Sequence, residues 1–272
     1  MTNLRTSSSS PSWKNLPLAL VLITATVTML GTASICRAKT LGFGPATFKI
    51  YSPVTSNLIG EVHFRVTQSD DGAVTVRSDA RYDNGDYDSE DDHLIPRPGG
   101  GPLKQISFSH SFFYRDGKPE RSSEADFATG LGSCTINDNG HAEVTRSTFN
   151  FPADTYAGAP VVIPLRNQLM KKAGVVDFHY FTCIPGPRLV TVRATAGSPA
   201  PWKYWPGEVV EVDVQPSFGW LTSIISPFLP TVRAWFDPSR DWYLVGVESA
   251  RFYRGTRILM VGVAPPSKST AH

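Results

Sequence analysis

An acidic run at positions 83–92 offers the oxygen ligands that calcium prefers. It reads Asp-Asn-Gly-Asp-Tyr-Asp-Ser-Glu-Asp-Asp and is followed by a stretch rich in proline and glycine. An EF-hand loop needs oxygen ligands at positions 1, 3 and 5 before a glycine at position 6. With Gly85 as position 6, Ala80 and Tyr82 would occupy positions 1 and 3, so the motif fails. We therefore expect a solvated, exposed loop over residues 79–101, with a looser calcium site as the alternative.

The histidines and serines do not form a recognisable catalytic motif. No two histidines stand at the spacing of metal ligands. His63, His110 and His179 fall in strand-like segments, which favours a hydrogen-bonded role on a surface or a lining. Gly132-Ser133-Cys134 lacks the two flanking glycines of a nucleophile elbow. The sequence thus predicts no catalytic residue, no metal and no cofactor. An enzyme remains the alternative, with a site assembled from distant residues, for instance His110 or His179 with a nearby Asp.

Two of the three cysteines, Cys134 and Cys183, lie well inside the chain and form an even pair. In an oxidising compartment such a pair predicts a disulfide. Closing a loop of about 50 residues would stabilise the fold by roughly 4 kcal/mol. Two separate buried thiols are the alternative. The third cysteine, Cys36, follows Ile35 rather than a small residue, so we expect no lipidation there.

An uncharged stretch at 217–230 is the strongest functional lead in the sequence. Leaving its large apolar side chains in water would be costly, and one interpretation is a short helix or loop buried against the sheet. The other is an apolar lip or lid over a cavity, or a patch that contacts lipid or a partner. The candidate ligand or lipid contacts are Phe218, Trp220, Leu221, Ile224, Ile225, Phe228 and Leu229.

The elements that must carry these residues are mostly strands. Apolar residues alternate with polar ones, the period of a half-buried strand, over residues 61–67, 106–113 and 210–215. Asp-Gly and Asn-Gly pairs predict tight turns between neighbouring strands, at residues 71–72, 116–117 and 139–140. A closing hairpin is expected between 242–248 and 257–263. Local turns between successive strands favour an antiparallel sheet over βαβ units.

One amphipathic helix is expected from residue 159 or 160 to about 173. Val162, Leu165 and Leu169 fall on one face, and Gly174 can cap the end. We predict a single mainly β domain over residues 39–264. Its fold is a curled antiparallel sheet or partly closed barrel with this helix packed against it. Residues 265–272 are expected to be a disordered tail.

The N-terminal segment has the features of an export signal. Arg5 and Lys14 precede an apolar core that begins at Leu16, and no acidic residue appears before Glu61. The core spans roughly 15 to 18 residues, whereas a helix that crosses a bilayer needs about 20. Small residues of the kind that a signal peptidase accepts follow the core. These features predict export from the cytosol.

We predict a cleaved signal peptide over residues 1–38, with cleavage after Ser34 or Ala38, and a periplasmic or secreted protein. An inner-membrane anchor over residues 16–35 is the alternative. Removal through Ala38 leaves 23 of the 26 basic residues against 24 acidic ones. A nucleic-acid partner is not expected, because such binding calls for a basic face or stripe.

Five stretches along the chain carry a family resemblance. They are Ile-Gly-Glu-Val at 59–62, Phe-Asn-Phe-Pro-Ala-Asp-Thr-Tyr at 149–156, Pro-Arg-Leu-Val at 187–190, Phe-Asp-Pro at 236–238 and Arg-Ile-Leu-Met at 257–260. Together they resemble uncharacterised exported β-rich proteins, a domain of unknown function in Gram-negative bacterial envelopes. The resemblance implies a curled antiparallel sheet with one helix, and it supplies no catalytic residues.

The function expected from these features is that of an exported envelope protein. We expect a non-catalytic binding module for an apolar or amphipathic ligand, such as an envelope lipid or glycan, with peripheral membrane contact. An envelope-modifying hydrolase and a structural envelope protein are the alternatives.

Overall fold

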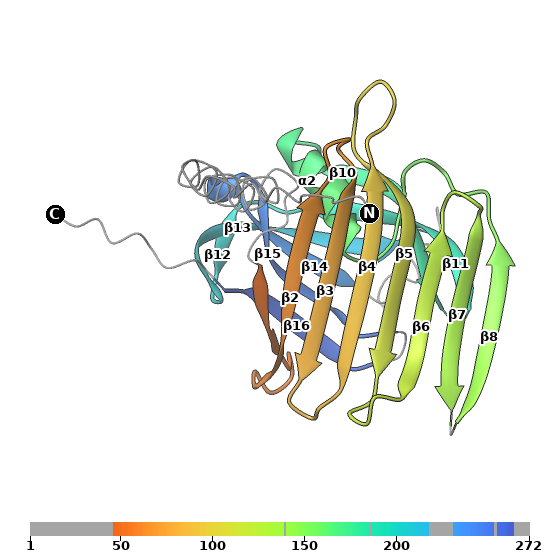
Figure 1. Cartoon of the computed structure of the whole chain (residues 1–272). Helices are drawn as coiled ribbons and strands as arrows, with labels where there is room; N and C mark the ends of the chain where they lie inside the picture. The colour runs from red at the N-terminus through yellow and green to blue at the C-terminus, as the bar shows by residue number, and fades with distance from the viewer. Residues whose placement is uncertain (1–45, 139, 185, 218–230, 253–254, 264–272) are drawn as a thin grey trace, which may run out of the picture.

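A computed structural model of the chain describes residues 46–263, except residues 139, 185, 218–230 and 253–254. The described residues fold mainly into strands of one curled sheet (Figure 1). In chain order the strands are β1 (Thr47–Tyr51), β2 (Leu58–Gln68), β3 (Val74–Tyr82), β4 (Tyr87–Ile95), β5 (Lys104–Phe113), β6 (Pro119–Asp126), β7 (Leu131–Asp138), β8 (His141–Thr148), β9 (Thr155–Tyr156), β10 (Val175–Cys183), β11 (Pro187–Ala196), β12 (Ala200–Trp202), β13 (Trp205–Pro216), β14 (Val232–Asp237), β15 (Tyr243–Ala250) and β16 (Arg257–Gly262). The helical elements are η1 (Ala159–Val161), α2 (Val162–Met170) and η4 (Pro238–Arg240).

The sheet consists of two antiparallel meanders that meet edge to edge. Strands β1 to β8 pair in succession in the first meander, and β10 to β16 form the second, with β12 branching off β13. Strand β1 pairs with β16 and joins the two meanders into one ribbon. The two-residue β9 pairs in parallel with β10, so β8 and β9 are the two ends of the ribbon.

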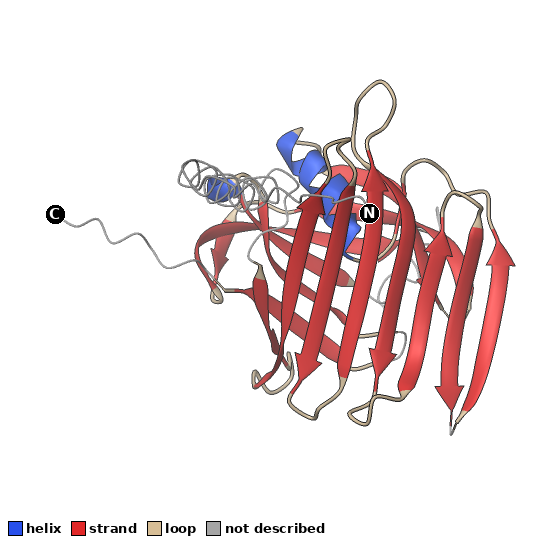
Figure 2. Ribbon diagram, viewed as in Figure 1, coloured by secondary structure: helices blue, strands red, loops and turns tan. Residues whose placement is uncertain are grey.

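The ribbon curls so that the two meanders face each other. In Figure 1 and Figure 2, strands β2 to β8 form a broad front layer, and strands of the second meander cross behind it. Strands β6 and β7 contact β10 and β11 across the interior. The concave faces of the two layers therefore enclose a common interior.

Alternating side chains give the sheet its apolar inner face. On β3, Val74 and Val76 are buried, whereas Thr75 and Arg77 lie on the outer face. Strand β14 is different, because its last four residues, 234–237, are buried in succession. There β12 covers the outer face of the sheet, and Trp202 of β12 stacks on Trp235 with ring centroids 4.5 Å apart.

The predicted amphipathic helix is confirmed, although it is shorter than expected. Elements η1 and α2 together span residues 159–170, and the apolar face of α2 packs into the core shared by both meanders. The predicted cap at Gly174 is wrong. The left-handed residue is Lys172, with φ 54°, and its amide donates to the carbonyl of Leu169.

The predicted exposed loop over residues 79–101 is wrong for most of its length, because this region contains the end of β3 and all of β4. A tight turn joins the two strands, and Gly85 adopts φ 89° in it. On β4, Asp88, Glu90 and Asp92 are buried on the inner face, and the intervening residues face outward. A carboxylate-rich segment forms a strand here because the inner carboxylates find buried partners.

The predicted fold class is confirmed: the described residues form a mainly β, curled antiparallel sheet with an amphipathic helix packed against it. Within these residues, no helix combines the length and the apolar character needed to cross a bilayer. The predicted leader over residues 1–38 and the predicted tail over residues 265–272 lie outside the described residues.

Candidate functional site

The two meanders and α2 enclose a cavity of about 740 Å³. This volume falls in the range of roughly 300 to 1,000 Å³ typical of pockets for small organic ligands. Most of the wall is aliphatic or aromatic, and both meanders and the helix contribute to it. The apolar lining includes Phe48, Val62, Phe64, Phe108, Phe112, Leu165, Val192, Val214, Ala234, Leu244, Ile258 and Met260.

A cluster of charged groups lies on the β4 and β5 side of the cavity. His110 of β5 lies between two buried carboxylates of β4, with Nε2 3.2 Å from Asp88 and Nδ1 3.3 Å from Glu90. Burial disfavours the imidazolium, but the hydrogen bond to Asp88 and the charges of Glu90 and Asp88 outweigh this. The pKa of His110 is therefore raised. Because both ring nitrogens face carboxylates, the protonated ring that donates from both is the favoured form.

Arg251, which follows β15, brings the second meander to the same cluster. Its Nη1 lies 3.4 Å from Asp86, its Nε lies 3.5 Å from Asp88, and its guanidinium stacks 4.1 Å from the ring centre of Tyr82. The Tyr82 hydroxyl donates to Asp88 at 3.0 Å. Burial, together with the charge of Asp88, raises the pKa of Tyr82, so the phenol stays protonated.

Arg121 of β6 lies next to this group. Its guanidinium lies 3.6 Å from the ring centre of Phe252, and Arg251 lies 5.8 Å from the same ring. Nη2 of Arg121 also lies 3.3 Å from the neighbouring Glu120. Phe252 therefore has a guanidinium from each meander beside it, and both arginines line the cavity.

The carboxylate of Glu90 also anchors the start of the helical segment. Its Oε1 accepts a hydrogen bond from the amide of Ala159 at 2.5 Å. Gly158 adopts φ 57°, and a Cβ at that position would overlap the Glu90 carboxylate. Tyr180 lies nearby on β10, where burial and the charge of Glu90 raise its pKa to about 12. One side chain thus connects β4, the histidine of β5 and the first residue of η1.

Asp92, the next inward residue of β4, is fully buried behind this cluster. Its Oδ1 accepts from the Gln105 amide at 2.7 Å, and Gln105 in turn accepts from the amide of Ala157 at 2.8 Å. Burial, followed by the charge of Glu90, raises the pKa of Asp92 well above its ordinary value. The Asp92 carboxyl is therefore a structural group that favours the neutral form.

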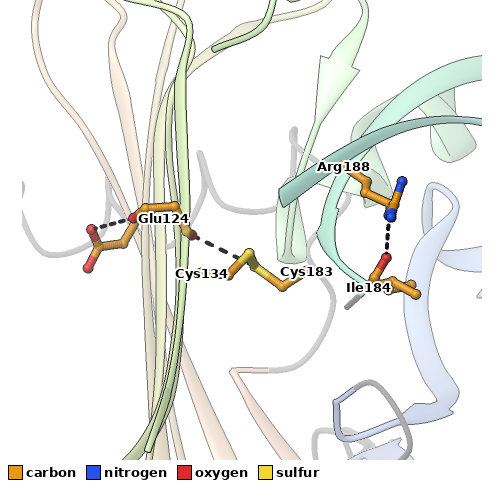
Figure 3. The surroundings of a disulfide bond; sticks show 6 residues. Glu124, Cys134, Cys183, Ile184 and Arg188 are labelled. Carbon is orange, nitrogen blue, oxygen red and sulfur yellow. Dashed lines mark hydrogen bonds between the residues drawn. A yellow bond between two sulfur atoms is a disulfide. The ribbon is translucent and has the colours of Figure 1, made fainter. Parts of the chain in front are cut away.

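The disulfide joins Cys134 of β7 to Cys183 of β10, with the two Cα atoms 5.9 Å apart. It bridges the two meanders (Figure 3). Both cysteines also line the cavity. Figure 3 also shows Glu124 on the side of the sheet away from the disulfide, where its carboxylate accepts from the Ser133 hydroxyl. The predicted pairing of Cys134 with Cys183 is thus present in the structure.

The two predicted His–Asp combinations both exist. His110 lies beside Asp88, and Nδ1 of His179 lies 2.9 Å from Asp154 on a half-exposed surface. General-base catalysis needs a ring nitrogen free to take a proton from substrate. In His110 both nitrogens are directed at carboxylates, so neither is free for that role in this arrangement. Within the described residues, no group of three or more His, Cys, Asp or Glu side chains is arranged to hold a metal ion.

The predicted ligand contacts Phe218, Trp220, Leu221, Ile224, Ile225, Phe228 and Leu229 lie outside the described residues. Pro216 and Thr231, on either side of that segment, line the cavity. The buried polar cluster was missed from the sequence because acidic residues usually indicate a solvated segment. The one available signal was the period-2 spacing of Asp88, Glu90 and Asp92 opposite His110.

No protein-family model matches the chain, and no curated protein matches it by sequence. Among solved structures, the chain is similar to a beta-barrel-like protein of the domain of unknown function DUF1849 from Brucella abortus. The TM-score is 0.47 with 12% sequence identity, over 82% of this chain and 96% of that chain. That protein, like the group resembled by the sequence, is β-rich and of unknown function. The likeness assigns neither a family nor an activity to this chain, and the envelope location stays a prediction.

Proposed function

We propose that this protein is an exported, non-catalytic binding module that holds an apolar or amphipathic molecule in the cavity between its two meanders. The single observation that carries the proposal is the cavity of about 740 Å³ with its mainly apolar wall. Such a volume is larger than the voids that packed protein interiors normally contain. An apolar ligand would gain the free energy of leaving water by filling it.

The charged groups beside the cavity support binding rather than catalysis. Asp88 and Glu90 are both engaged with His110, and Glu90 additionally holds the amide of Ala159. Groups fixed in this way orient a ligand and stabilise the wall, but they offer no free base or nucleophile. The contacts predicted for Phe218 to Leu229 remain part of this proposal, as does contact with a membrane surface.

Binding is tested with N-phenyl-1-naphthylamine, an uncharged apolar dye that fluoresces in apolar surroundings, added to the delipidated full chain. We expect saturable binding by the wild type. Ser249 of β15 lines the cavity and is partly buried. Ser249→Phe should fill the cavity and weaken dye binding at least fivefold, whereas Ser249→Ala should leave binding unchanged. A wild type that does not bind the dye, or equal binding by Ser249→Phe, would contradict the proposal.

Export is tested by the intact mass of the protein recovered from the envelope or secreted fraction. We expect the loss of the first 34 or 38 residues and a mass gain of about two daltons on reduction of the Cys134–Cys183 disulfide. The disulfide supports an oxidising compartment. Recovery of the protein from the cytosol with Met1 still attached would contradict this part of the proposal.

A further inference from the structure

The two arginines that line the cavity have hydrogen-bond donors to spare. Nε and Nη2 of Arg251 and Nε of Arg121 are buried without a hydrogen-bond partner. The ion pairs of Arg251, from Nη1 to Asp86 at 3.4 Å and from Nε to Asp88 at 3.5 Å, are long, and Nη2 takes part in neither. A guanidinium offers five N–H donors, and a buried donor without an acceptor is unfavourable.

The unpaired donors of the two arginines lie at the cavity, whereas the other unpaired atoms of the described residues do not. Among the described residues, other buried unpaired polar atoms belong to Asp91, Asp92, Arg97 and Gln168, none of which lines the cavity. On the cavity wall, the unpaired buried atoms are therefore all guanidinium nitrogens. They call for an acceptor, and a guanidinium edge matches the two oxygens of a carboxylate or phosphate.

Resting on the proposed function, we propose that the ligand is an amphiphile with an anionic carboxylate or phosphate head. The head binds Arg121 and Arg251 beside Phe252, and the acyl chain fills the apolar part of the cavity. Asp86, Asp88, Glu90 and Glu120 oppose a further anion in this region. Each of these carboxylates already has a partner, however. Asp86 pairs with Arg251, and Glu120 pairs with Arg121. Asp88 contacts Tyr82 and His110, and Glu90 contacts His110 and the amide of Ala159. The anionic head takes the guanidinium edges that these carboxylates leave open.

The head is tested with a matched series: dodecanoate, dodecyl phosphate, 1-dodecanol and dodecylamine. Each displaces N-phenyl-1-naphthylamine from the full chain at pH 7.5. We expect the two anions to compete at roughly tenfold lower concentration than the alcohol, and the amine to compete least. The order of dodecanoate and dodecyl phosphate then assigns the head as carboxylate or phosphate. An amine that competes as well as the anions would overturn the inference.

Variants assign the preference to the two arginines. Arg121→Gln and Arg251→Gln should each bring the anions close to the level of the alcohol measured on the same variant. Arg251→Lys keeps the charge but loses the planar guanidinium, so it should keep part of the preference for anions over the alcohol. It also tests the role of Arg251 if Arg251→Gln does not fold. Arg65→Gln, on the exposed outer face of β2, is the control and should change nothing.

Two failures are distinguishable in this design. If the wild type binds neither dye nor alcohol, the proposed cavity function is wrong. If the dye and the alcohol bind but the arginine variants keep the full preference for anions, only the assignment of the head to Arg121 and Arg251 is overturned.

Discussion

At the scale of single residues, His110 and Asp92 are two buried titratable groups whose protonated forms are favoured by their surroundings. His110 is held by two carboxylates, which raise its pKa, and Asp92 is deeply buried, which raises its pKa as well. In both groups a raised pKa favours the protonated form in the folded state. By linkage, both therefore stabilise the fold more at low pH than at high pH.

His110→Gln tests the first of these effects. The stabilisation by the imidazolium is complete below its unfolded pKa of about 6.5, and it is lost as the pH rises through the raised folded value. The deficit in unfolding free energy of the variant should therefore shrink between pH 6 and pH 9. We expect a change of about 1 kcal/mol in urea unfolding. A deficit that grows with pH would contradict the prediction.

Asp92→Asn tests the second effect. The Asp92 carboxyl is most favourable below about pH 3.9 and becomes a burden as the pH rises through its raised folded pKa. The neutral amide should therefore stabilise the protein by about 1 to 2 kcal/mol at pH 8 and make little difference near pH 4. Unfolding curves at the two pH values measure this. Asp91→Asn, one position away and facing Arg77 on the outer side, should give no gain.

At the scale of elements, alternating apolar residues predicted β2, β5 and β13 correctly, and the closing β15–β16 hairpin is also confirmed. The same rule failed for β4, where the inner face is occupied by carboxylates whose partners come from other strands. It also failed for β14, which is buried on both faces and so has no alternation. The cavity and its polar cluster depend on those two strands and on pairings between distant segments. For this reason the sequence predicted only two parts of the site: the Cys134–Cys183 pair and the alternative in which His110 lies beside an Asp.

The C-terminus of α2 provides an element-scale prediction. Lys172 adopts φ 54°, where a side chain is strained and glycine is favoured. Lys172→Gly should stabilise the protein by about 0.5 to 1 kcal/mol in thermal or urea unfolding. The matched change at Lys171, which has φ −84°, should give no gain and a small loss. Equal effects at the two positions would show that backbone conformation is not the cause.

At the scale of the whole molecule, the disulfide ties the two free ends of a long ribbon. Cys134 lies one strand from the β8 end and Cys183 lies one strand from the β9 end. The bond therefore holds the curl closed around the cavity. The pairing of β1 with β16 joins the meanders on the opposite side of the fold.

Loss of the disulfide should therefore affect both stability and binding. We expect Cys134→Ser/Cys183→Ser, or reduction of the wild type, to lower the unfolding free energy by about 2 to 4 kcal/mol. Dye affinity should fall as well, because β7 and β10 are then free to separate. Guanidinium unfolding with and without reductant measures the first effect. Reductant should not change the double variant, and an unchanged midpoint for the reduced wild type would contradict the prediction.

The β1–β16 pairing also dictates when this chain can fold. Phe48 pairs with Gly262, so β1 cannot gain its second neighbour until β16, the last strand of the described residues, has been synthesised. Until then β1 presents an open edge on which another polypeptide could add. If the chain is exported N-terminus first, as proposed, it would have to be kept from self-association for nearly its whole passage. Truncations that remove β16 should consequently aggregate rather than yield a smaller soluble sheet.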